Sequence, residues 1–136
     1  MRTHLLQRAH DERGAAAVEF ALILPLLILL VFGIAYFSIG FNRKQGLQAA
    51  AREGARVGAL PQSTTADIQS RVTAALAGSV PGTPTVTITP SGTRPCDLAP
   101  VGTRVKVVVT APYSFEIPLF GARNISMSGT GEFKCE

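Results

Sequence analysis

The sequence has little of what most enzymes and nucleic-acid-binding proteins depend on. Its 136 residues include no tryptophan and only two histidines, two cysteines and two tyrosines, and just 16% are charged. The formal net charge of +4 comes from scattered lysines and arginines that form no basic run, so we expect no nucleic-acid-binding surface. The basic excess reflects a shortage of acids, with weak attraction to anionic lipid headgroups as the alternative interpretation.

The placement of the histidines argues against catalysis. Both His4 and His10 precede Gly14, so the rest of the chain has no imidazole to act as a base or ligand. The remaining acids are scattered, two cysteines alone do not make a zinc site, and the glycines of residues 54–58 lack a phosphate-binding signature. We therefore predict no enzyme, no catalytic residue, no metal, no cofactor and no small-molecule substrate.

Residues 15–41 form one apolar run of 27 residues, in which Glu19 is the only acidic or basic side chain. As a helix the run would be about 40 Å long, more than the roughly 30 Å of a bilayer's hydrocarbon core. A cleaved secretory signal is the competing interpretation, but its apolar region is shorter and a small-residue cleavage site follows it. We predict a transmembrane helix over 15–41, although the basic residues that flank it on both sides do not decide its orientation.

The helical pattern continues over residues 42–60 and ends at Pro61. Small residues recur at every fourth position, and this small-residue stripe consists of Gly46, Ala50, Gly54 and Gly58. Such a stripe allows another backbone to approach closely. It suits packing either against the protein's own domain or against a helix of another subunit.

Residues 61–136 predict a small α+β domain with about three antiparallel strands. Thr64 or Thr65 can cap a second helix that reaches about Ala77. Its apolar face would consist of Ile68, Val72, Ala75 and Leu76. Alternating or β-branched residues predict strands over 85–89, 104–111 and 125–133, with a loop over 91–102 and an irregular turn region over 112–121.

The two cysteines, Cys96 and Cys135, both lie well beyond the apolar run. In an exported domain such a pair predicts one disulfide, whereas a cytoplasmic domain would hold two free thiols. The bridge would close a loop of about 40 residues and contribute about 3–4 kcal/mol in the chain-entropy model. That is a large contribution for so small a core.

The segment from Arg13 to Phe20 resembles the processing site of type IV prepilins, most closely the Tad (Flp) branch. The features in common are a charged 14-residue N-terminal segment ending in Gly14, then Glu19 and Phe20 just ahead of the long apolar run. The resemblance implies a leader peptide over 1–14 that a prepilin peptidase removes between Gly14 and Ala15. It also implies that Glu19 and Phe20 act in assembly and registration of subunits.

Residues 14–60, including Ala51–Arg56, look like the TadE-like family of minor pilins and pseudopilins, and a looser resemblance extends over the later strand pattern. It implies a single-pass protein of the cytoplasmic (inner) membrane, or of the pilus or cell surface, with its C-terminal domain outside the cytoplasm. The implied partners are the peptidase, other pilins and pseudopilins, Tad platform proteins and the secretion ATPase machinery. Three alternatives stay open: an anchored binding or adhesion module that enters no filament, an anchored enzyme, and a cytoplasmic domain of opposite orientation.

A carboxylate in an apolar helix needs a partner, which makes Glu19 the most informative residue of the membrane segment. Cleavage after Gly14 would leave a charged amine on Ala15. That amine could approach the Glu19 of a neighbouring subunit and fix the axial register of the two helices. Alternatively, Glu19 only marks the interfacial edge of the helix.

Overall fold

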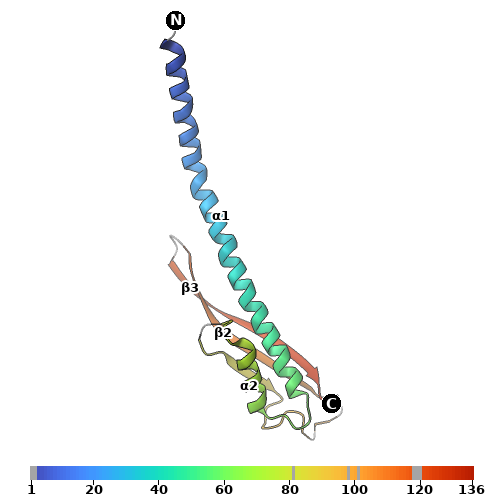
Figure 1. Ribbon diagram of the computed structural model, residues 1–136. Helices are drawn as coiled ribbons and strands as arrows, with labels where there is room; N and C mark the ends of the chain where they lie inside the picture. Colours follow the sequence, from blue (N-terminus) through green and yellow to red (C-terminus); the bar gives the residue numbers. More distant parts are fainter. Residues whose placement is uncertain (1–2, 81, 98, 101, 118–120) are drawn as a thin grey trace. The chain divides into compact units, whose positions relative to one another are not determined.

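A computed structural model describes residues 3–80, 82–97, 99–100, 102–117 and 121–136. The fold is α+β, as predicted, with two helices followed by a three-stranded antiparallel sheet (Figure 1). The elements in chain order are α1 (Thr3–Gly58), α2 (Thr65–Leu76), β1 (Thr85–Thr89), β2 (Arg104–Ile117) and β3 (Gly121–Lys134). They divide into two compact units, Met1–Ser38 and Ile39–Glu136.

The first unit is the N-terminal part of α1, and from Val18 to Phe37 its surface is apolar on every side except at Glu19. Large apolar side chains from Val18 to Phe37 are exposed around the helix, and Pro25 lies within the helix without ending it. The helix is long and apolar enough to cross a membrane between Gly14 and Gly58, with a mean hydropathy of 2.7 in its most apolar window. Exposed apolar surface on all sides is what a bilayer accommodates and water does not.

The second unit is a sheet of order β1-β2-β3 that is covered on one face by α2 and by the last turns of α1, within residues 39–58. Alternate residues of β2 point into the core, where Val105, Val107 and Val109 are fully buried. Ile68 and Val72 of α2 meet the same cluster at the glycines of α1. Residues 42–60, predicted as a helical extension ahead of the domain, lie within this compact unit, which begins at Ile39.

Helix α2 forms where its capping residues predict it. Thr64 is the N-cap, and its side chain and that of Asp67 bond each other's backbone N–H groups in a capping box. Ile68, Val72 and Leu76 are buried as predicted. Ala75 is exposed, so its assignment to the apolar face is wrong.

Two strands are longer than predicted. Of the irregular region expected over 112–121, residues 112–117 and 121 belong to strands, and residues 118–120 lie outside the described residues. β2 continues through Pro112 to Ile117, and β3 begins at Gly121 rather than at Ile125. β1 pairs with β2 only as far as Thr110, so no strand lies beside Pro112 on that side. The backbone N–H and C=O of Thr130 point away from β2, toward Gln48. In an antiparallel pair this orientation recurs at every second pair of residues, and the pair that contains Pro112 is one of these. The missing N–H of Pro112 therefore removes no hydrogen bond to β3.

The first helix ends at Gly58, two residues before the predicted end at Leu60. The backbone N–H of Ala59 still bonds the carbonyl of Ala55 at 3.0 Å, and that of Leu60 bonds Val57 at 3.1 Å. The last turn therefore tightens before Pro61.

Candidate processing and assembly site

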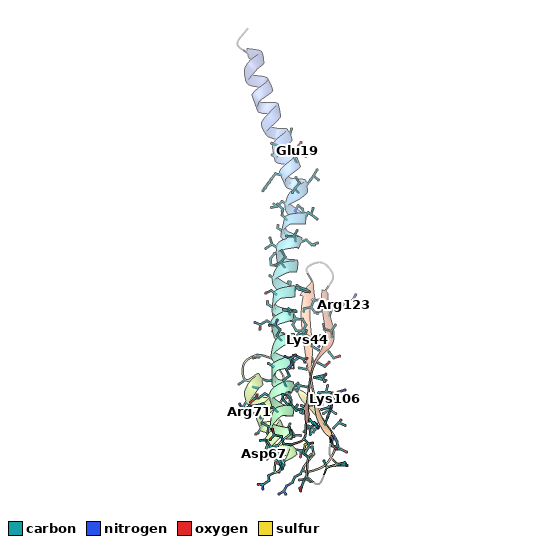
Figure 2. The ribbon with its side chains drawn as sticks, turned by 90° about the vertical axis from the view of Figure 1, so that its right-hand side faces the viewer. Glu19, Lys44, Asp67, Arg71, Lys106 and Arg123 are labelled. Atoms are coloured by element: carbon teal, nitrogen blue, oxygen red, sulfur yellow. A yellow bond between two sulfur atoms is a disulfide. The ribbon has the colours of Figure 1, made fainter. Side chains whose placement is uncertain are left out.

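The predicted cleavage point lies inside a continuous helix. Gly14, Ala15, Glu19 and Phe20 all belong to α1 and are exposed, and Figure 2 labels Glu19 on this helix. No change of element marks the predicted boundary between residues 14 and 15. Glycine lowers helix stability by about 1 kcal/mol relative to alanine, so Gly14 makes this segment easier to unwind.

Glu19 and Ala15 lie four residues apart in α1 and therefore on the same face of the helix. Between residues 15 and 42 the sequence holds no lysine, arginine or histidine with which Glu19 could pair. A neighbouring helix that packs against this face would meet both positions at once. The arrangement thus permits a pairing between subunits.

The small-residue stripe packs inside its own domain. A Cβ atom on Gly54 would lie 2.5 Å from Val72 Cγ2, and one on Gly58 would lie 2.8 Å from Ile68 Cδ1. Gly46 lies beside Ser79, and Ala50 is fully buried. Of the two uses that the sequence left open for the stripe, the structure shows packing against the protein's own domain.

Helix α1 and strand β3 approach each other more closely than the sequence predicted. The backbones of Gly129 and Gly131 lie directly against those of Leu47 and Ala51, with no room for a Cβ atom at either glycine. Two glycines on the same face of a strand are the signal that could have revealed this contact, because they often mark a close backbone approach.

The side chain of Gln48 fastens α1 to the outer edge of β3. Its amide nitrogen donates to the carbonyl of Thr130 at 2.5 Å, and its amide oxygen accepts from the Thr130 N–H at 3.1 Å. Lys44 Nζ donates to the carbonyl of Ser128. No sequence pattern distinguishes such a glutamine from an ordinary exposed one.

One ion pair at the surface, Glu53–Arg71, joins α1 to α2, and a second, Glu53–Arg56, lies within α1. Glu53 accepts from Arg71 Nη2 at 2.7 Å and from Arg56 Nη2 at 3.4 Å. The hydrogen bond from Arg71, and to a lesser degree the charge of Arg56, lower the pKa of Glu53 although partial desolvation opposes them. The hydrogen bonds from Thr64 likewise lower the pKa of Asp67.

The disulfide joins Cys96 and Cys135, the pair that the sequence indicated, with their Cα atoms 5.6 Å apart. Cys96 is buried in the loop before β2, and Cys135 directly follows β3. The backbone N–H of Cys135 also bonds the carbonyl of Thr103 at 2.9 Å. The end of the chain is thus held both covalently and by hydrogen bonds.

The acidic side chains are scattered over the described residues, and the two cysteines are bonded to each other. Within those ranges, no group of three or more His, Cys, Asp or Glu side chains is close enough to hold a metal ion. A shallow hollow at the end of α1 is lined by Val57, Leu60 and Pro61, and its one carboxylate, Asp67, is already bonded to Thr64. The hollow therefore supplies no acid–base pair.

Comparison with known families gives one match, in which the model of the TadE-like protein family aligns with residues 14–56. The chain carries a TadE-like segment. This TadE-like segment runs from the predicted cleavage point into the last turns of α1, so it contains Glu19 as well as Gln48 and Gly54. The match indicates a component associated with the Tad pilus, and the apolar helix fits a membrane anchor. No curated protein and no solved structure matches the chain.

Proposed function

We propose that the protein is a minor pilin or pseudopilin of a Tad-type pilus or a related secretion assembly. The observation that carries the proposal is the match of the TadE-like family to a segment that begins at Gly14 and has Glu19 in its apolar helix. Residues 1–14 would face the cytoplasm, α1 would cross the inner membrane once, and the second unit would lie outside. The Cys96–Cys135 disulfide supports export, because disulfides persist in oxidising compartments.

In this proposal a prepilin peptidase removes residues 1–14 and creates a new amine on Ala15. The amine and the Glu19 carboxylate share one helix face, so a neighbouring pilin helix can pair its amine with this carboxylate. In an apolar surrounding, the alignment at which both charges are neutralised is strongly favoured over any shifted alignment. The protein would contribute structure rather than catalysis, together with other pilins, the Tad platform proteins and the secretion ATPase.

The first test is the intact mass of the protein, purified from membranes of its own host without a reducing agent. We expect a chain that starts at Ala15 and is about two mass units lighter than the dithiol form, because the disulfide removes two hydrogens. The matched control is the same measurement in a host whose prepilin peptidase is inactive, where Met1–Gly14 should remain. If the leader also remains with an active peptidase, processing is contradicted. A membrane-anchored binding or adhesion module that enters no filament would then be favoured.

The second test is Glu19→Gln, which removes the charge with little change in shape. We expect normal membrane insertion and cleavage but at least a tenfold loss of incorporation into filaments, because the partner amine is left unpaired in an apolar surrounding. Incorporation is measured by quantifying the protein in sheared filaments against the membrane fraction. Glu19→Asp is the control that keeps the charge, and it should retain part of the incorporation into filaments. Normal incorporation of Glu19→Gln would overturn the pairing.

A further inference from the structure

The β2–β3 hairpin extends beyond the three-stranded part of the sheet and packs against the first turns of α1 in the second unit. The first residue of β1, Thr85, pairs with Thr110, so the hairpin beyond Ala111 has two strands only. Its Tyr113 ring packs on Gly40, where a Cβ atom would lie 3.6 Å from Tyr113 Cε1. The guanidinium carbon of Arg43 lies 4.8 Å from the centre of the same ring, which itself stacks on Phe115 at 5.7 Å.

This contact coincides with the end of the apolar run. Gly40 belongs to the last turn of the predicted transmembrane segment, and Arg43 follows its final residue, Phe41, by two positions. Arg43 and Lys44 are the first charged residues after the apolar run, and cations in that position are typical of the level where a bilayer changes from hydrocarbon to headgroups. Tyrosine is also typical of this interface, because its ring is apolar and its hydroxyl is polar.

The same end of the unit is positively charged. Arg123 pairs with Phe115 across the hairpin, and Figure 2 shows Arg123 and Lys44 toward one end of the unit, away from Asp67 and Arg71. Residues 39–50 contain no acid, and within residues 111–128 Glu116 is the only acidic residue. The sequence thus gives these two segments three basic residues against one acidic residue.

One apolar side chain on this surface is more exposed than its position suggests. Ile125 is the cross-strand partner of Tyr113, yet it is 46% exposed whereas Tyr113 is only 7% exposed. Arg123 precedes Ile125 by two residues on the same face of β3, and Arg43 lies over the ring of Tyr113, the partner of Ile125. This arrangement suits an interface in which apolar groups reach acyl chains while cations meet phosphates.

We propose that Arg43, Lys44, Arg123 and Ile125 form a headgroup-binding surface for anionic phospholipids of the membrane that α1 crosses, with the buried ring of Tyr113 supporting Arg43 from beneath. The cations attract the phosphates, and the exposed side chain of Ile125 rests at the boundary of the acyl chains. The hairpin thereby lies along the bilayer and orients the outer unit on it. This inference rests on the membrane anchor of the proposed function and not on assembly into a filament.

The test uses the full-length chain in nanodiscs of phosphatidylcholine alone or with about 30% phosphatidylglycerol, at about 50 mM salt. The measured quantity is the amide hydrogen exchange of β3 residues 121–127. We expect exchange to be at least about threefold slower in the anionic nanodiscs, with the difference lost at about 0.5 M salt because the charges are then screened.

Arg123→Gln and Arg43→Gln should each reduce this lipid-dependent difference by half or more. Each variant is compared with itself in the two lipids, so any loosening of the hairpin itself cancels. Lys106→Gln, an exposed lysine of β2 away from this end, is the matched control and should keep the full difference.

Three results would overturn the inference. Equal exchange of the unmodified chain in both lipids would overturn this inference and leave the membrane anchor standing. The same would follow if Lys106→Gln reduced the lipid-dependent difference as much as the arginine variants do, because the attraction would then depend on net charge and not on this surface. A chain that does not enter nanodiscs would overturn the membrane anchor and this inference together. A difference that depends on lipid charge, on salt and on the two arginines would support it.

Discussion

Gly131→Ala is expected to detach β3 from α1 and to lower the free energy of unfolding of the second unit by about 3 kcal/mol or more. The Cβ atom would overlap the backbone carbonyl of Ala51, and a helix backbone cannot rotate away as a side chain can. Gly129→Ala should act in the same way against Leu47. For a domain whose total stability is about 5–15 kcal/mol, such a loss leaves a substantial unfolded fraction.

The measurement is denaturant unfolding of the full chain in nanodiscs, followed by hydrogen exchange of the sheet. Ser126→Ala is the matched control, because Ser126 is an exposed residue of the same strand that pairs with Pro112. Its effect should stay within about 0.5 kcal/mol, as is usual for surface substitutions. If Gly131→Ala were as stable as Ser126→Ala, the close packing of β3 on α1 would be contradicted.

The double variant Cys96→Ala/Cys135→Ala is expected to lose about 3–4 kcal/mol of stability, because the 39-residue separation between the cysteines is no longer closed in the unfolded chain. The native fold should persist at low temperature. The end of β3 is still held by the bonds from Cys135 N–H to Thr103 and from Glu136 N–H to Ala59. Replacing the cysteines should therefore weaken the domain without changing its topology.

Unfolding midpoints of the double variant and of the unmodified chain are compared with and without a reducing agent. Reduction should lower the midpoint of the unmodified chain toward that of the variant and leave the variant unchanged. A reductant effect on the variant would show that something other than this bridge is being measured. An unmodified chain that resists the shift after verified reduction would contradict the stabilisation assigned to the disulfide.

The parts of the fold that the sequence predicted are those in which a local pattern has a single structural solution. An unbroken apolar run yields α1, the capping pair Thr64 and Asp67 yields the start of α2, and alternation between prolines yields β1. Pro112 misled the prediction because proline usually interrupts a sheet. Here β1 has already ended beside it, and that depends on strand lengths that no local pattern encodes.

The candidate site likewise has one part that a local sequence pattern predicts and another that depends on distant parts of the chain. The segment from Gly14 to Phe20 is a local motif and was recognisable, and residues 14–56 match the TadE-like family. The stripe from Gly46 to Gly58 could not be assigned a partner, because small residues at every fourth position serve intramolecular and intermolecular packing equally well. The roles of Gln48 and Arg43 depend on β3 and β2, which lie far away in the sequence.

The amide of Gln48 also limits how copies of this protein can polymerise. A sheet with two open edges can add strands without end, as fibrils do. Here the outward backbone groups of Thr130 are already bound to Gln48, and the carbonyl of Ser128 is bound to Lys44, so an incoming strand would have to displace α1 from β3. Pairing of β1 with the β1 of a second copy would join two copies into a closed pair. Open-ended growth by strand addition is therefore blocked at residues 128–130 of β3 as long as α1 stays in place.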